Sequence, residues 1–224
     1  MLWYKAWLET RWRFVFMMVS TAVFWLPRFM GAPAQKAWVG VALGITLLNC
    51  MSALYLAGSG INSQTTYSAI SGFHRSMFFT LSLPVSRRRL FFARAGFGAM
   101  ESCAFVLMTT AVIPLFQPDA SLFQLLRYGA RAIVCTLAVY ALSAFLSCVL
   151  DEMWQFTGTI LILGGVAMLQ FRFAGLSFLS PLRGISLLTC PLTAPAPWAP
   201  MLTSVVCVAV LLFASVRVLE RKEF

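Results

Sequence analysis

The sequence predicts an all-α membrane protein, a single transmembrane domain over residues 1–224 with about six membrane-spanning helices. The first observation behind this is composition. Of the residues, 60% are hydrophobic and 11% charged, with a mean hydropathy of +0.84, whereas a soluble domain is about half apolar and about a quarter charged. The second observation is that no segment between the apolar stretches is long enough to bury a core of its own. The bilayer must therefore be the solvent of this fold.

Residues 2–13 have the pattern of an amphipathic helix. One side of this helix carries Trp3, Tyr4, Trp7 and Leu8. The other side carries Lys5, Glu9 and Arg13. Because Trp and Tyr beside a polar face favour the headgroup layer, we expect residues 1–13 to form an interfacial (elbow) helix along the membrane. A frayed cytoplasmic tail is the alternative.

Six apolar stretches follow that are suited to crossing a hydrocarbon core, which takes about 20 helical residues. They are residues 14–26, 38–57, 95–116, 130–150, 156–169 and 200–216. The first stretch is short and ends at Pro27, so we expect Trp12 and Arg13 to fill its inner end. These stretches define the six predicted spans.

The 17 Lys and Arg residues, which give a net charge of +10, gather at the ends of the apolar stretches, where basic side chains meet lipid headgroups. If the chain starts in the cytoplasm, eleven of them fall on the cytoplasmic side and six on the outer side. This asymmetry, together with an even number of spans, predicts a multi-pass protein of the cell membrane with both termini in the cytoplasm. Membrane lipids are expected partners. Nucleic acid is not, because its binding would need a basic stripe on a polar face.

Two connections are unusual for a helical membrane protein. Residues 58–94 form the longest polar interval, which the topology places in the cytoplasm, with Pro84 ending one short helix and an arginine triplet beginning the next. Residues 171–199, on the outer side, are too apolar for a solvated loop and too rich in proline for a full span. We expect short re-entrant helices there, which dip partway into the membrane and are covered by protein.

The motifs of nucleotide, metal and nucleophilic chemistry are missing from the sequence. No Gly-Lys pair occurs, so the chain lacks the G-x-x-x-x-G-K-[ST] phosphate loop. The single histidine, His74, is not part of an H-E-x-x-H zinc motif. None of the six cysteines forms a C-x-x-C pair, so we expect them to pack as small hydrophobic residues. We expect no catalytic residue, no metal site and no cofactor bound by this chain.

Glu101 is the one acidic residue well inside a predicted span. An intramembrane carboxylate is costly and is by default a functional candidate. Arg94 lies seven residues earlier, two helical turns away on nearly the same face. The alternative is a packing role, in which Arg94, a hydroxyl or water satisfies the carboxyl group. Both interpretations stay open.

The segment FFTLSLPVSRRRLFFARAGFGAME resembles the region after the second span of ABC-2 type permeases, the membrane subunits of a class of ABC exporters. Those proteins carry a motif of the type L-P-V-S-R-R-R-L-x-x-A-R there, after a short coupling helix. The matching residues are Leu83, Pro84, Val85, Ser86, Arg87, Arg88, Arg89, Leu90, Ala93 and Arg94. Many relatives have an acidic residue early in the coupling segment, whereas residues 63–76 have none here.

The resemblance implies a permease that pairs with a second copy or a homologous permease and encloses an outward substrate path. It also implies a separate ABC ATP-binding subunit, which holds ATP and Mg²⁺ and docks on the coupling segment. The residues it assigns to this docking are Ile70, His74, Arg75, Phe78, Phe79, Leu81, Leu83, Pro84, Arg87, Arg88 and Arg89.

Two other classes of function remain as alternatives. One is a membrane scaffold or assembly protein with no transport role. The other is a membrane enzyme acting on lipid, which would need at least two polar catalytic groups at one depth, and Glu101 alone does not supply them.

Overall fold

The computed structural model describes residues 2–29, 34–57, 86–150, 152–173, 180–195 and 197–221. These residues are helical or in turns and contain no strand. Six helices have 21 or more residues: α1 (Leu2–Phe29), α2 (Ala34–Ala57), α4 (Arg87–Val112), α5 (Leu122–Val149), α6 (Glu152–Arg172) and α8 (Trp198–Arg221). A 3-10 turn, η1 (Ile113–Leu115), follows α4, and a five-residue helix, α7 (Pro181–Ile185), precedes α8. The all-α class is confirmed.

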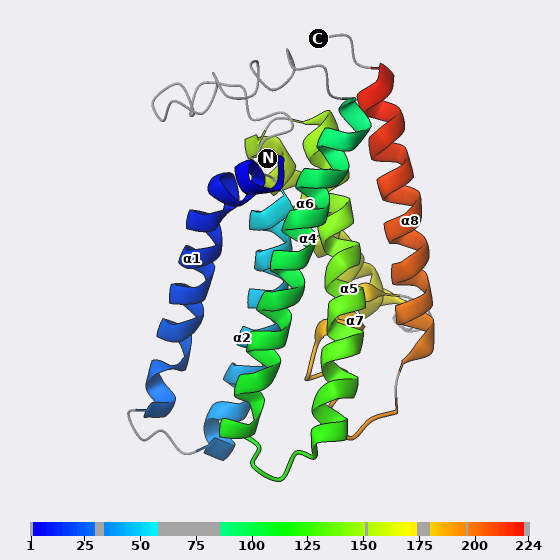
Figure 1. Ribbon diagram of the computed structural model, residues 1–224. Coiled ribbons are helices and arrows are strands. Elements are labelled where there is room, and N and C mark those ends of the chain that lie inside the picture. Colours follow the sequence, from blue (N-terminus) through cyan, green and yellow to red (C-terminus); the bar gives the residue numbers. More distant parts are fainter. Residues whose placement is uncertain are drawn as a thin grey trace.

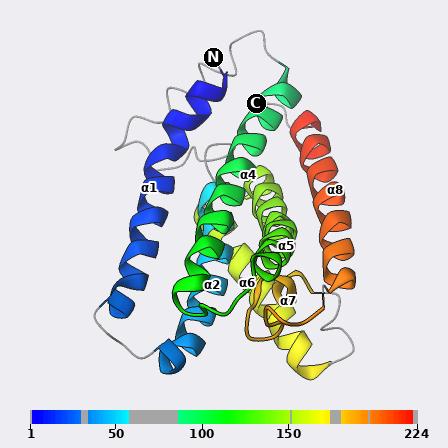
Figure 2. The same cartoon turned by 60° about the horizontal axis from the view of Figure 1, so that its bottom comes forward.

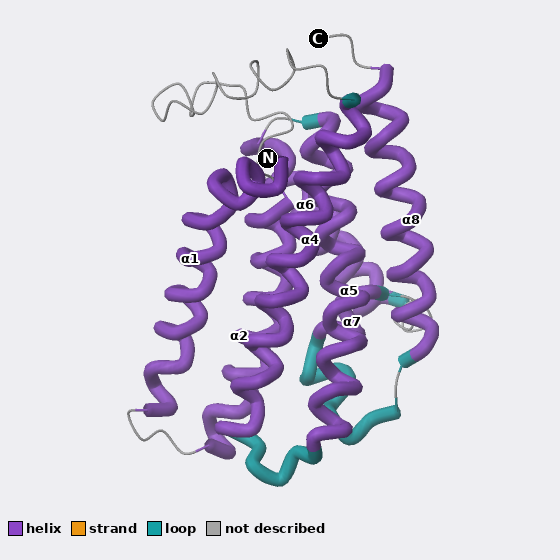
Figure 3. The backbone as a smooth tube through the Cα atoms, in the orientation of Figure 1, coloured by secondary structure: helices purple, strands orange, loops and turns teal. Residues whose placement is uncertain are grey.

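The long helices run up and down in one bundle, and α1 begins at the same end of the bundle at which α8 ends (Figure 1). The α5 helix is central, in contact with α2, α4, α6, α7 and α8 (Figure 2). The turn from η1 to α5 and the chain after α7 lie toward the opposite end (Figure 3).

Four helical segments are long and apolar enough to cross a membrane: Trp38–Ala57, Phe91–Leu115, Leu122–Val149 and Trp198–Arg221. The apolar part of α6, Trp154–Leu169, is shorter, and α1 does not meet the same criterion. The structure therefore supports a membrane-embedded helical protein, while the number of six spans stays a prediction.

The expected interfacial helix and the first span are joined in one helix, whose first turns lie across the end of the bundle before the helix bends along it (Figure 1). The interfacial position of residues 1–13 stays a prediction. Residues 2–29 form one continuous helix, α1. No glycine or proline interrupts the sequence before Pro27, and a break inside a bilayer would leave backbone groups without partners. The helix also continues for two residues past Pro27, where the first span was expected to end.

The fourth predicted span starts too late. We expected it at residue 130, but α5 begins at Leu122. Ser121 and Gln124 form a capping box, in which the Ser121 amide donates to Gln124 Oε1 at 2.9 Å and the Gln124 amide donates to Ser121 Oγ at 3.3 Å.

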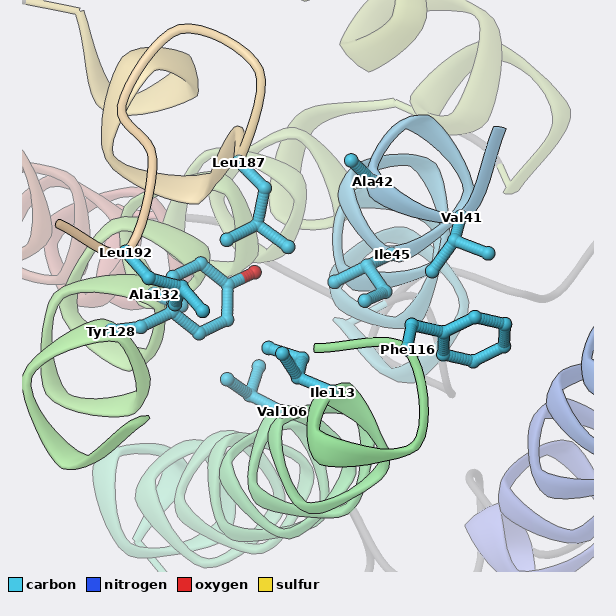
Figure 4. Close-up of a cluster of buried hydrophobic side chains, with 10 residues drawn as sticks. All are labelled: Val41, Ala42, Ile45, Val106, Ile113, Phe116, Tyr128, Ala132, Leu187 and Leu192. Atoms are coloured by element: carbon cyan, nitrogen blue, oxygen red, sulfur yellow. The ribbon is translucent and has the colours of Figure 1, made fainter. Parts of the chain in front are cut away.

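The core lies where α2, α4 and α5 meet the chain after α7 (Figure 4). Its buried side chains are Val41, Ala42, Ile45, Val106, Ile113, Phe116, Tyr128, Ala132, Leu187 and Leu192. A second cluster, nearer the ends of α2 and α5, includes Leu56, Cys135, Tyr140 and Ile185. Residues from 185 to 192 contribute to both clusters, so part of the proline-rich segment is integral to the core.

Gly98 marks the closest approach of α4 to its neighbours. A Cβ atom there would lie 2.6 Å from Tyr140 Oη of α5 and 2.9 Å from the Leu56 carbonyl oxygen of α2. Tyr140 Oη also donates to the Ala95 carbonyl at 2.9 Å, so the tyrosine cannot move without losing this bond.

We expect Gly98→Ala to lower the free energy of unfolding by about 1–3 kcal/mol, because overpacking forces helices apart. Thermal unfolding in detergent, followed by tryptophan fluorescence, measures the effect. Gly40→Ala is the matched control, since no atom lies within 4 Å of a Cβ at that α2 position. Equal stability of the two variants would contradict the packing argument.

Candidate functional site

Most of the residues assigned to ATPase docking lie outside the described residues. These are Ile70, His74, Arg75, Phe78, Phe79, Leu81, Leu83 and Pro84. The described chain resumes at Ser86, at the end of the bundle where α1 begins and α8 ends (Figure 1).

The arginine triplet occupies the first turn of α4. Ser86 caps this helix, because its Oγ accepts a hydrogen bond from the Arg89 amide at 3.4 Å. Positive side chains are unfavourable at a helix N-terminus, where the helix dipole is also positive. Arg88 and Arg89 are exposed, and they therefore form a basic surface suited to an anionic partner.

One such partner comes from the chain itself. Arg88 forms an ion pair with Glu220 in the last turn of α8. Glu220 is a negative side chain at the C-terminus of α8, where the helix dipole is also negative. The ion pair therefore offsets an unfavourable charge at the end of each helix. Because Arg88 is well exposed, the pair is a weak contact. The pair nevertheless connects the start of α4 to the end of α8.

Glu101 is buried in the interior of the bundle and bonded to a hydroxyl group. Thr10 Oγ1 of α1 donates to Glu101 Oε1 at 2.6 Å, and Oε2 has no hydrogen-bond partner among the described residues. A hydroxyl group was one of the expected hydrogen-bond partners of this carboxyl group, and Thr10 provides it. Arg94 is half-buried on the same helix.

Further contacts fix the first turns of α1. The Trp7 ring lies 5.9 Å from the Phe97 ring of α4, and Arg13 Nη1 donates to the Tyr55 carbonyl of α2 at 3.2 Å. Together with the bond from Thr10 to Glu101, these contacts tie the start of α1 to α2 and α4. They support a packing role for Glu101.

We expect Thr10→Val to lower the free energy of unfolding by about 1–2 kcal/mol. Hydrogen bonds between membrane helices average about 0.6 kcal/mol, but here the loss leaves a buried carboxyl group without its partner. Thr21→Val is the matched control, because Thr21 Oγ1 is bonded at 2.8 Å to the Met17 carbonyl of its own helix. Unfolding in detergent measures both, and a larger loss in the control would exclude this role of Thr10.

Two polar contacts between other helices use neutral side chains. Thr109 Oγ1 of α4 donates to Asn49 Oδ1 of α2 at 3.0 Å, and Gln155 Nε2 of α6 donates to Ser143 Oγ of α5 at 2.8 Å. Such bonds are typical of helix association in membranes. We assign them to packing.

A cluster of polar contacts that was not predicted from the sequence lies between α5 and residues 185–192. Three side chains of α5 donate to backbone carbonyls there. Arg127 Nη2 donates to the Leu192 carbonyl at 2.7 Å and Tyr128 Oη to the Ile185 carbonyl at 3.2 Å. Arg131 donates through Nη2 to the Cys190 carbonyl and through Nη1 to Cys190 Sγ at 2.6 Å.

These three side chains explain how an irregular segment can pack inside the bundle. Backbone carbonyls outside a helix need donors when no water is available. The donors come from positions 127, 128 and 131, within about one turn of α5. Arg131 is only 1% exposed. The expected protein-covered segment is thus present in part, as α7 and the turns after it.

Arg127 and Arg131 are two of the six basic residues that the charge distribution places on the outer side of the membrane. Their four-residue spacing inside an apolar helix was the available signal of a different role. Which carbonyls they would meet could not be foreseen, because those carbonyls lie about 60 residues later in the chain.

No protein-family model matches this chain, and no curated protein and no solved structure shows significant similarity to it. Within the described ranges, no group of three His, Cys, Asp or Glu residues is placed to hold a metal ion. Function must therefore be argued from the chain itself.

Proposed function

We propose that this protein is the membrane permease subunit of an ATP-driven ABC exporter. The observation that carries the proposal is the motif over residues 83–94, which resembles that of ABC-2 permeases. Its second half forms a capped helix start with exposed arginines. Because these arginines are part of α4 itself, a partner that docks on them could transmit its motion directly to this helix.

The arrangement of the helices is compatible with this proposal. Six long helices alternate in direction, and α1 begins and α8 ends at one end of the bundle (Figure 1). We propose that all six cross the membrane and that this end faces the cytoplasm, as the eleven-to-six distribution of basic residues favours. The cell membrane is the proposed location.

The mechanism follows in outline from coupling between two conformations. Two permease subunits enclose a path, and two ATP-binding subunits, which hold ATP and Mg²⁺, close on ATP binding. The coupling segment, residues 58–94, carries this motion to α4, and through the Arg88–Glu220 contact also to α8. Only a difference in affinity between the two states can drive such a change.

A scaffold or assembly role is the main alternative, and co-purification distinguishes it from transport. The tagged chain is extracted in mild detergent, and its partners are identified by mass spectrometry. A stoichiometric ATP-binding subunit that is lost when residues 70–89 are altered supports the exporter. Its absence, repeated after gentler extraction, argues for the scaffold or for a lipid-acting enzyme.

A further inference from the structure

The contact between α5 and residues 186–192 buries more positive charge than its hydrogen bonds require. A hydrogen bond to a carbonyl needs a donor but no charge. Arg131 instead places a full charge in the interior, at 1% exposure. A buried charge without a counter-charge is expensive, inside a membrane above all.

No acidic group among the described residues neutralises this charge. The partners of Arg131 are the Cys190 carbonyl and thiol and the Tyr128 ring, 5.1 Å from the guanidinium carbon. Its Nε has no hydrogen-bond partner in the part of the chain that the structure describes. Arg127, one turn away on the same face, adds a second charge, and its contacts within the described ranges are the Leu192 carbonyl and the Phe123 ring. The pair therefore retains donor capacity and a net charge of two.

We infer that Arg127 and Arg131 form a binding site for the phosphate group of an anionic amphiphile. Guanidinium groups bind phosphate through paired, charge-assisted hydrogen bonds. In the present conformation, the carbonyl oxygens of Cys190 and Leu192 occupy the positions that phosphate oxygens take in the bound state. Binding of the ligand therefore requires the chain at Cys190 and Leu192, whose carbonyls now accept from the two arginines, to move away from α5 while Leu187 stays in the core.

The surroundings of Arg127 favour a ligand with an acyl chain. Arg127 is half-buried, whereas Leu122, Phe123 and Leu126 beside it on α5 are 72%, 71% and 63% exposed. A headgroup phosphate can thus reach Arg127 while an acyl chain lies along these apolar side chains. Arg131, one turn further along the helix, then completes the site.

The test uses the purified full-length chain alone, so its outcome is separate from that of the exporter proposal. Binding of phosphatidylglycerol and of phosphatidylcholine is compared by native mass spectrometry. We expect a preference for phosphatidylglycerol that Arg127→Gln and Arg131→Gln each reduce about tenfold or more. Arg131→Lys keeps the positive charge and a long side chain, so it should retain part of the preference that Arg131→Gln loses. Equal losses in these two variants would contradict binding through the charge.

Arg172→Gln is the matched control, because it removes an exposed arginine near the same end of the bundle. An equal loss in this control, or no preference in the unmodified chain, would overturn the site. A second measurement needs no variant. Phosphatidylglycerol should increase maleimide labelling of Cys190, located by peptide mass spectrometry, because the ligand displaces this buried residue. If inorganic phosphate alone gives the same increase, the site stands and its assignment to an amphiphile is wrong. No increase with either probe contradicts the site.

Discussion

Replacing Gly184 by alanine is expected to lower the free energy of unfolding by about 1–3 kcal/mol, because the interior has no room for a methyl group. A Cβ atom at this position of α7 would collide with Cys135 Sγ and lie 3.2 Å from Cys135 Cβ. Cys135 is fully buried on α5, where Ser204 of α8 donates to its sulfur at 3.5 Å. The added methyl group must therefore displace α7 or disturb the contact between α5 and α8.

The double variant Cys135→Ala/Gly184→Ala gives this prediction a sharp test. Removing the sulfur removes the main collision, so the double variant should be more stable than Gly184→Ala alone. The coupling between the two changes, read from a double-mutant cycle of thermal unfolding, isolates the contact. Gly165→Ala is the control, since a Cβ atom there has no neighbour within 4 Å. Additive effects of the two substitutions would show that α7 does not press against α5 at this point.

Displacement of α7 should also weaken the contacts made by the following turn. Ile185 and Leu187, directly after Gly184, belong to the two core clusters. The Tyr128 bond to the Ile185 carbonyl depends on the same backbone. Gly184→Ala is therefore expected to increase labelling of Cys190 by maleimide, which provides a local readout beside global stability.

The second large effect is expected at the arginine triplet. The variant Arg87→Gln/Arg88→Gln/Arg89→Gln should lose ATP-driven transport and the co-purified ATP-binding subunit, while its amount in the membrane stays the same. The reason is that three charges at the start of α4 are removed from the surface on which the partner is proposed to dock. Co-purification from the membrane fraction measures docking directly, without knowledge of the substrate.

Two controls separate docking from other roles of these arginines. Glu220→Gln breaks the Arg88–Glu220 contact and leaves all arginines in place. Arg217→Gln/Arg221→Gln removes exposed positive charge from α8 at the same end of the bundle. We expect both variants to retain the partner. Normal insertion and full transport by the triplet variant would make the coupling assignment wrong, and an equal loss in the α8 variant would point to general charge attraction.

Two helices begin or extend where local signals in the sequence placed them. The stretch 38–57 was predicted with the bounds that the apolar part of α2 has. The start of α4 at the arginine triplet also agreed. Both rest on local signals, namely a continuous apolar run and the proline that ends the segment before the triplet. The start of α5 was placed eight residues too late, at residue 130, although the capping pair Ser121 and Gln124 marks the helix start at Leu122.

Composition and the pattern of apolar stretches were enough to predict a helical membrane protein and to locate most of the long helices that the structure describes. Hydrophobicity and helix caps act over a few residues, so they can be read along the chain. The hydrogen bond from Thr10 to Glu101 and the burial of Arg131 against Cys190 could be seen only in the folded structure. These partners are 91 and 59 residues apart. Which of them meet depends on how the helices pack, because each polar side chain inside the bundle must find its partner on another segment.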